Sequence, residues 1–293
     1  GFTPTAGAKV LYYAGCRAAY DRPVVARAGL ELLRKAGAVT TLGAAEPCCG
    51  HTLWFTGQRE AAAKQAEAAM KAILKAAAGA ETIVVADAAC ALTMRAFWPE
   101  VAAERDLTWT LQVKHAPEFL FPLVGKALQL TSQVPEQVHF TEPCEAPDAW
   151  SLKLLAKVPG LQVAPLPILP CGAPGGMREA HPDVADLVGL RALDIAKAAG
   201  AATLVTSNPL CESWLAELSQ RAGKGVRVVD VLQLVARGAG IELPGEPAPG
   251  APAPAAAAAP PAMPKPKLTP EELEARKKAA LEKAAAMKAQ KAG

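Results

Sequence analysis

The sequence predicts an α/β protein with two similar halves, each a small, mostly parallel sheet flanked by helices. Three observations support this fold class. Short apolar segments alternate with amphipathic segments in the same order twice along the chain, which is typical of parallel α/β units. Cysteines occupy matching places in the two halves. A proline- and alanine-rich stretch then separates both halves from a basic C-terminal segment.

The predicted elements of the first half follow from its apolar pattern. They are a buried strand over 9–16, an amphipathic helix over 23–37, a strand over 38–42, an alanine-rich helix over 60–78 and a strand over 82–87. The motif EPCCG, residues 46–50, lies between the second strand and the long helix.

The second half repeats this order. Its predicted elements are a strand over 137–144, a helix over 148–158, a strand over 161–168, a helix over 182–199 and a strand that starts at 203 and leads to Cys211. The motif PCG, residues 170–172, stands where CCG stands in the first half. The same unit therefore occurs twice.

Three cysteine positions recur at the ends of the predicted strands. They are Cys16, the pair Cys48 and Cys49, and Cys90 in the first half, and Cys144, Cys171 and Cys211 in the second. The last interval is 41 residues in the first half and 40 in the second. Because the carboxyl ends of parallel strands meet at one edge of a sheet, we expect each half to gather its thiols in one place.

The composition predicts a globular protein that is not inserted in a membrane. The chain has 293 residues, of which 51% are hydrophobic, which is enough for a sizeable core. No uncharged apolar run is long enough to span a bilayer, and the N-terminus lacks the pattern of a signal peptide. We therefore expect a cytoplasmic location.

The basic charge of the chain belongs to its C-terminal region. Residues 244–293 carry eight of the 31 basic and five of the 28 acidic side chains, so residues 1–243 have 23 of each. A neutral body gives no support to nucleic-acid binding by the folded part. We expect no nucleic-acid partner.

The C-terminal region divides into a spacer and a helix. Proline at the density seen in residues 244–267 predicts an extended, semi-rigid linker. Thr269, Pro270 and Glu272 are the N-cap, first-turn and capping-box residues of a basic helix over 268–293. This helix is either solvated or a docking helix for a partner subunit. The predicted domains are therefore 1–125, 126–243, the linker 244–267 and the helix 268–293.

The adjacent thiols of Cys48 and Cys49 raise a chemical question. Neighbouring Cα atoms are only about 3.8 Å apart, which rarely allows a disulfide between them. The two residues are therefore either small buried side chains or metal ligands.

The cysteine motifs resemble a known family. GC, EPCCG and DAAC in the first half, and TEPC, PCGAPGG and NPLC in the second, look like the paired cysteine-rich CCG domains of the B subunit of heterodisulfide reductases. They are similar, too, to the iron–sulfur subunits of glycolate, lactate and anaerobic glycerol-3-phosphate oxidoreductases. The resemblance covers about residues 9–236 and implies iron–sulfur clusters, in some members noncubane ones, that pass electrons or reduce a disulfide.

The sequence departs from the family pattern in both halves. The family motif closes with two cysteines separated by two residues, and Asp87 and Asn208 stand at the first of those positions. Pro170 replaces the first cysteine of the second CCG motif. The first half keeps four thiols, enough for a [4Fe–4S] cluster with one cysteine on each iron. The second keeps three, so its site has an open iron, takes another ligand such as His181, or is degenerate.

Other residues beside the cysteines have candidate roles. Gly15, Gly50 and Gly172 allow tight turns that leave backbone N–H groups free to point at cluster sulfurs. His51 follows CCG directly and is the candidate catalytic proton donor, or a further ligand. Asp87 and Asn208 are either ligands or helix N-caps. His115, His139 and His181 have no patterned partner, and a structural or surface role is favoured for each of them.

Two classes of function stay open. The first is an electron-transfer subunit of an oxidoreductase that works with flavoprotein or ferredoxin-like partners, with peripheral membrane association through a partner at the inner face. The second is a structural CCG scaffold that binds zinc at one site or no metal, with a tail that docks partners. A metal-free thiol oxidoreductase is disfavoured because the chain has no CxxC motif.

Overall fold

The computed structural model describes residues 8–37, 39–42, 45–77, 79–145 and 149–245 of the chain. The chain divides into two compact units, Gly1–Ala256 and Ala257–Gly293. All described residues belong to the first unit. The predicted helix over 268–293 and nearly all of the predicted linker lie outside the described residues.

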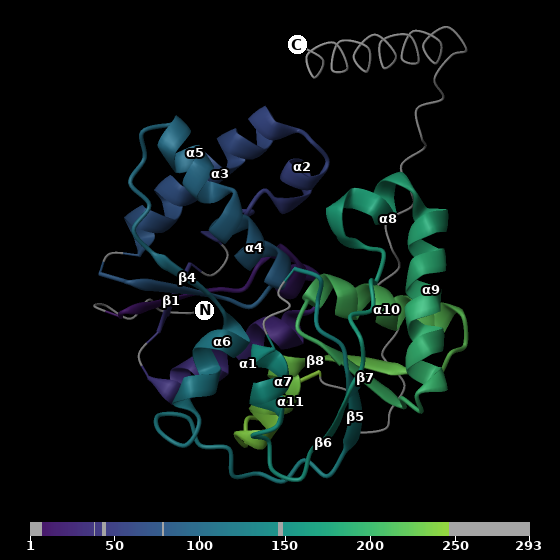
Figure 1. Cartoon of the computed structure of the whole chain (residues 1–293). Coiled ribbons are helices and arrows are strands. Elements are labelled where there is room, and N and C mark those ends of the chain that lie inside the picture. The colour runs from purple at the N-terminus through teal and green to yellow at the C-terminus, as the bar shows by residue number, and fades with distance from the viewer. Residues whose placement is uncertain (1–7, 38, 43–44, 78, 146–148, 246–293) are drawn as a thin grey trace, which may run out of the picture. The chain divides into compact units, whose positions relative to one another are not determined.

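The first half forms a four-stranded parallel sheet with the strand order β2-β1-β3-β4 (Figure 1). Its strands are β1 (Val10–Tyr13), β2 (Thr40–Thr41), β3 (Thr82–Val85) and β4 (Gln112–His115). Its helices are the π-helical turn η1 (Arg17–Asp21), α1 (Pro23–Ala36), α2 (His51–Phe55), α3 (Arg59–Ala76), α4 (Ala88–Ala96), α5 (Trp98–Glu104), α6 (Ala116–Leu120) and η3 (Phe121–Leu123).

The second half has the same topology, with the strand order β6-β5-β7-β8. Its strands are β5 (Gln137–Phe140), β6 (Gln162–Pro165), β7 (Thr203–Thr206) and β8 (Arg227–Asp230). Its helices are α7 (Trp150–Leu155), η4 (Pro174–Gly176), α8 (Met177–Ala180), α9 (Pro182–Ala198), α10 (Pro209–Arg221) and α11 (Val231–Gly238). The predicted α/β class with two repeated parallel sheets is confirmed.

Each sheet contains a fourth strand that the sequence did not indicate. β4 lies at the edge of its sheet, pairs with β3 alone among the described strands, and has the mixed polar sequence QVKH. In the described part of the chain, β8 likewise pairs with β7 alone. The strand expected over 38–42 is limited to Thr40 and Thr41, which pair with Leu11 and Tyr12 at the opposite edge. β4 has a polar, partly exposed sequence, whereas the four residues of β8 are all buried but lead directly into α11.

The two faces of each sheet belong to different apolar cores. In β1, Tyr12 packs with α1, whereas Leu11 and Tyr13 pack with α3, α4 and α5 on the opposite face. In β7, Val205 and Leu204 divide in the same way, with Leu204 facing α9 and α10. This alternation follows from the two-residue period of side chains along a strand.

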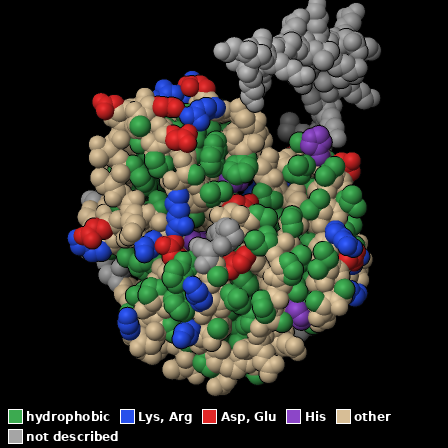
Figure 2. Space-filling view, viewed as in Figure 1, with side chains coloured by type: hydrophobic (Ala, Val, Ile, Leu, Met, Phe, Trp, Pro, Cys, Tyr) green, Lys and Arg blue, Asp and Glu red, His purple; other side chains and the backbone are tan. Residues whose placement is uncertain are grey.

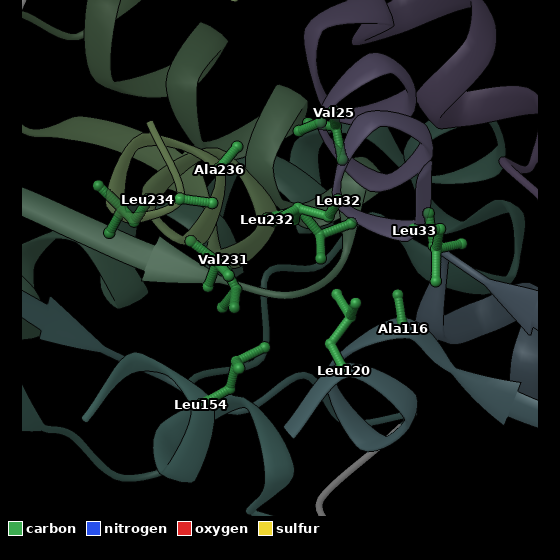
Figure 3. Packing of buried hydrophobic residues seen from close by; sticks show 14 of the residues in the cluster. Val25, Leu32, Leu33, Ala116, Leu120, Leu154, Val231, Leu232, Leu234 and Ala236 are labelled. Atoms are coloured by element: carbon green, nitrogen blue, oxygen red, sulfur yellow. The ribbon is translucent and has the colours of Figure 1, made fainter. Parts of the chain in front are cut away.

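The two halves share their central core (Figure 3). Side chains of α1 and α6 from the first half pack with those of α7 and α11 from the second. The fully buried leucines Leu32, Leu120, Leu154 and Leu234 belong to this cluster. Burying each such side chain stabilises the fold by about 1.5–3 kcal/mol. A shared core of this kind holds the two repeats together as one unit. It therefore fixes the relative position of the two sheet edges that carry the cysteines.

The surface of this unit carries mixed charge. On the face in Figure 2, acidic and basic side chains are interspersed. Among the described residues, none of the helices has both the length and the apolar character required to cross a bilayer.

Candidate metal centre

Four thiols of the first half converge at the carboxyl edge of its sheet. Cys16 follows β1 at the start of η1, Cys48 and Cys49 lie in the loop between β2 and α2, and Cys90 lies in the first turn of α4 after β3. The Cys49 Sγ donates to the Cys90 Sγ at 3.0 Å. The Cys48 sulfur is hydrogen-bonded to the thiols of Cys16 and Cys49. The loops after three parallel strands meet here, as the sequence indicates.

Hydrogen bonds within this group favour a thiolate on Cys48. The hydrogen bond from Cys16, followed by that from Cys49, lowers the pKa of Cys48 to about 2. The backbone N–H of Gly50 donates to the same sulfur at 3.4 Å. The pKa of Cys16 is raised because its thiol donates to Cys48, and the pKa of Cys49 is raised by its bonds to Cys48 and Cys90. Binding a metal would therefore release the protons of the other thiols.

The Glu46 side chain ties the two cysteine loops together. Its carboxylate accepts the backbone N–H groups of Ala14 at 2.9 Å and Gly15 at 2.7 Å. Burial raises the pKa of Glu46 to about 7, against the lowering effect of the two N–H groups. The carboxylate thus fixes the chain just before Cys16 relative to Cys48.

Three further side chains hold the EPCCG loop, and sequence reasoning missed all of them. Tyr13 donates its hydroxyl to the carbonyl of Pro47 at 2.5 Å. Gln65 of α3 donates to the carbonyl of Cys48 at 3.0 Å, and the indole of Trp98 donates to the carbonyl of Cys49 at 3.0 Å. Only the tertiary structure could reveal them, because they come from separate elements and form no motif.

The absence of a side chain at Gly15 leaves room for the thiols. Its φ is +86°, a left-handed conformation that favours glycine. A Cβ at this position would lie 2.9 Å from the Cβ of Asp87 and 3.3 Å from the Sγ of Cys90. A side chain at residue 15 would therefore press directly on the thiol group.

Asp87 and Asn208 are helix N-caps. The Asp87 carboxylate accepts the N–H groups of Ala89 at 2.9 Å and Cys90 at 3.3 Å. Asn208 does the same for Leu210 and Cys211 at the start of α10. Each cap places its cysteine in the first turn of a helix that begins at the carboxyl edge of its sheet.

His51 is buried beside the first thiol group. Its Nδ1 lies 2.9 Å from the Thr93 hydroxyl, which itself donates to the carbonyl of Ala89. The hydroxyl therefore accepts from Nδ1–H, and Nε2 keeps its lone pair with no hydrogen-bond partner in the described part of the chain. Burial lowers the pKa of His51 to about 4, against the raising effect of Cys48. At neutral pH the ring is uncharged.

The other histidines lie in different surroundings. His115 at the end of β4 and His139 in β5 are buried, whereas His181 is exposed at the N-terminus of α9.

The donor set of the first half fits an iron–sulfur or zinc group. Four soft sulfur donors, a glycine cradle and an N–H group aimed at sulfur lie together. Two sulfurs on one tetrahedral zinc are about 3.8 Å apart, which is wider than the Cys49–Cys90 contact. The thiols would have to separate on binding. Accordingly, no three His, Cys, Asp or Glu side chains of the described residues stand ready around a single ion.

The second half brings two of its three thiols into contact. The sulfurs of Cys171 and Cys211 are 2.6 Å apart, and both residues are buried, whereas Cys144 is exposed. The hydrogen bond to Cys171, followed by burial, raises the pKa of Cys211. Pro170 occupies the place of Cys48, so this group lacks the sulfur that Cys16 contacts in the first half.

The segments that carry these cysteines match a known protein family. The sequence pattern of the family described as "CCG: Cysteine-rich domain" matches residues 10–95 and 140–216. These two segments contain all seven cysteines.

Relatives with this similarity include named subunits of redox enzymes. The chain is 29% identical to the D subunit of dihydromethanophenazine:CoB–CoM heterodisulfide reductase from Methanosarcina mazei, over 80% of this chain and 60% of the relative. It is 26% identical to the C subunit of anaerobic glycerol-3-phosphate dehydrogenase from Escherichia coli K12, over 72% of this chain and 55% of the relative. It is 24% identical to lactate utilization protein A 2 of Bacillus cereus, over 78% of this chain and 98% of the relative.

The chain spans less than two thirds of the length of the first two of these relatives. The matched segments nevertheless cover more than half of the chain, and each contains the cysteine-bearing part of one repeat, with β4 and β8 beyond them. The chain therefore belongs to the family of proteins built on the cysteine-rich CCG domain, which it contains twice.

Proposed function

We propose that this protein is an iron–sulfur electron-transfer subunit of an oxidoreductase complex similar to heterodisulfide reductase. It would relay electrons between a flavin or iron–sulfur partner and a quinone, a disulfide or another acceptor. The observation that carries this proposal is the convergence of Cys16, Cys48, Cys49 and Cys90 at one sheet edge. The similarity of the chain to proteins that are named as subunits of redox enzymes also supports it.

The first half would hold a [4Fe–4S] cluster through these four cysteines. Such a cluster supplies one-electron transfer when bound. The chain's own contribution is to hold the four sulfurs within contact, to direct the Gly50 N–H at the Cys48 sulfur, and to cover Cys49 and Cys90 from water. Burial and N–H donors both act on the reduction potential of such a site. Because both adjacent cysteines are among these four ligands, a noncubane cluster is the alternative to a strained four-cysteine cube.

The protonation state of His51 bears on the role that it can have beside the four thiols of the first half. Its neutral ring offers the Nε2 lone pair, which suits an additional ligand or a proton acceptor. The imidazolium form, which a proton donor requires at neutral pH, is disfavoured by burial because the pKa is lowered to about 4. We therefore favour ligand or acceptor over donor.

The second half offers fewer ligands. Cys144, Cys171 and Cys211 are the predicted ligands of a second site, with zinc as an alternative metal, but only three thiols are present. Gly172 would turn the chain beside Cys171 there. We expect iron to load in the first half, because three thiols leave one iron of a four-iron cluster open.

The expected partners are other redox subunits, of flavoprotein or ferredoxin-like type. Two of the similar proteins are named as subunits, and the chain spans only part of their length. The neutral body and its interspersed surface charges favour protein partners over nucleic acid. We propose a cytoplasmic protein that reaches the inner face of the membrane through such a partner.

The test is metal analysis of the full chain purified without oxygen. A brown protein with iron, acid-labile sulfide and an electron paramagnetic resonance signal after reduction is expected. Cys48→Ser and Cys90→Ser should each remove most of the iron, whereas the matched variant Cys171→Ser should remove little. A colourless protein with stoichiometric zinc would instead identify a structural scaffold.

A further inference from the structure

Two sulfur atoms of the second half lie in close contact. The Sγ atoms of Cys171 and Cys211 are 2.6 Å apart, although the residues are 40 positions apart in sequence. A disulfide bond is about 2.05 Å long, so the two sulfurs need to move only a little to form one. We propose that Cys171 and Cys211 form a reversible dithiol/disulfide couple, a second redox centre that is distinct from the first thiol group.

The loop of Cys171 is fixed against its neighbours. Gly172 has a φ of +80°, and a Cβ there would lie 2.7 Å from the carbonyl oxygen of Ala185 in α9. A Cβ on Gly189 would lie 3.0 Å from the carbonyl oxygen of Cys171. The Thr141 hydroxyl donates to the carbonyl of Pro167 at 2.9 Å and accepts the N–H of Leu169 at 3.0 Å. The loop is therefore positioned from both sides.

The partner sulfur is positioned independently. Asn208 caps α10 through the N–H groups of Leu210 and Cys211, which sets the Cys211 side chain in the first helical turn. Cys171 is 2% exposed and Cys211 is 6% exposed. Each sulfur is therefore positioned by the contacts of its own loop or helix, which keep the pair together in the folded protein.

The corresponding pair in the first half is in a different situation. The Cys49 and Cys90 sulfurs are 3.0 Å apart, but Cys49 is also hydrogen-bonded to Cys48, which is bonded to Cys16. Pro170 removes the equivalent of Cys48 from the second half. The pair Cys171 and Cys211 therefore lacks the equivalent of the Cys48 sulfur, which would favour a site with four ligands. The two thiols are hydrogen-bonded to each other instead.

The couple exchanges two electrons with a low-molecular-weight disulfide. In the forward direction, the S–S bond of the small disulfide breaks and the Cys171–Cys211 bond forms. The two protons of the cysteine thiols pass to the two small thiols released, so the protein pair is oxidised and the small disulfide is reduced. Because both sulfurs are buried, exchange depends on local opening of the chain. The fraction of the pair that is oxidised should therefore be measured after the protein has reached equilibrium with the buffer.

The experiment uses the full chain, purified without oxygen and equilibrated in glutathione buffers of increasing disulfide fraction. After acid quenching, free thiols are alkylated under denaturing conditions and the chain is digested with trypsin. Cys144, Cys171 and Cys211 fall on three separate peptides, residues 127–153, 158–178 and 198–221. We expect the second and third peptides to become linked, lighter than their sum by two hydrogen atoms, and to separate again in reducing buffer.

The matched control is Cys144→Ser, which should keep the same linkage, whereas Cys171→Ser should leave Cys211 alkylated. Two results of the peptide analysis would overturn the proposal: alkylation of both Cys171 and Cys211 in every buffer, or Cys144 as the main linked partner. Equal iron loss in Cys171→Ser and Cys48→Ser would overturn it too, because Cys171 would then bind metal. The cysteines of the first half lie on other peptides, so failure of the cluster proposal is read separately.

Discussion

Arg22 in the first half forms a two-point ion pair with Glu212 in the second. The Arg22 Nε donates to Glu212 Oε2 at 2.8 Å, and its Nη2 contacts Oε1. The Arg22 side chain is 14% exposed and that of Glu212 is fully buried. This pair lies between the turn that follows Cys16 and the helix that carries Cys211. It therefore links the two thiol-bearing edges directly.

Removing the guanidinium should destabilise the whole protein. We expect Arg22→Leu to lower the free energy of unfolding by about 3–5 kcal/mol, because a buried carboxylate loses its cationic partner. The double variant Arg22→Leu/Glu212→Gln should recover much of this loss. Urea unfolding followed by circular dichroism measures both.

A matched control for this prediction is the more exposed pair of Arg17 with Glu179, which also joins the two halves. Arg17→Leu should cost less than about 1 kcal/mol, because exposed pairs contribute little. If both arginine variants were equally unstable, charge at the interface in general, rather than burial of Glu212, would be the cause.

Gly15→Ala should damage the first thiol group specifically. The added methyl group would lie 2.9 Å from Asp87 and 3.3 Å from the Cys90 sulfur. Gly57→Ala is its control, because Gly57 has a similar φ of +77° with no atom within 4 Å of the new Cβ. Both variants pay about 1 kcal/mol for the left-handed backbone. Only Gly15→Ala should lose most of its iron, as measured per chain; equal retention in the two variants would contradict the packing described.

Both adjacent cysteines should matter for the cluster. Cys48 is hydrogen-bonded to Cys16, and Cys49 is hydrogen-bonded to Cys90, so each sulfur already belongs to the group. We expect Cys48→Ser and Cys49→Ser each to abolish the signal of the reduced cluster in electron paramagnetic resonance. A variant that keeps full iron with a shifted potential would show that its thiol lies beside the cluster without binding it.

His115 should make the protein less stable in acid. Its ring is fully buried, and burial, followed by the charge of Arg95, lowers its pKa from 6.5 to about 4. As the pH falls from 6.5 towards 4, the unfolded chain takes up this proton before the folded one, so stability is lost over that interval. Stability is fully present above pH 6.5. The loss approaches about 3 kcal/mol.

The test compares the wild type with His115→Leu by urea unfolding at pH 7 and pH 4.5. The difference between the two free energies of unfolding at pH 7, where the ring is largely neutral in both states, serves as the reference. At pH 4.5 the variant should be favoured by about 2–3 kcal/mol relative to that difference. Other titrating groups are common to both proteins and cancel. A difference that does not change with pH would refute the prediction.

Much of the fold could be predicted because its signals are local. The strand over 82–87 and the helix over 182–199 have strong apolar periodicity, and the structure has β3 at Thr82–Val85 and α9 at Pro182–Ala198. The edge strand β4 was missed because its sequence is polar and partly exposed, and β8 because its four residues lead directly into α11. The central core shared by α1, α6, α7 and α11 has no local signal, since its residues are far apart in sequence.

The sequence by itself determined the α/β repeat, the cysteine positions and the difference of one thiol between the halves, because these follow from periodicity and from counting. Only the tertiary structure decided which groups support the thiols, such as Trp98 on the Cys49 carbonyl, and that Asp87 and Asn208 are caps. It alone brought Cys171 to Cys211, a dithiol that a search for CxxC could not find. The physical reason is that parallel strands distant in sequence end at one edge, where residues 40 positions apart come into contact.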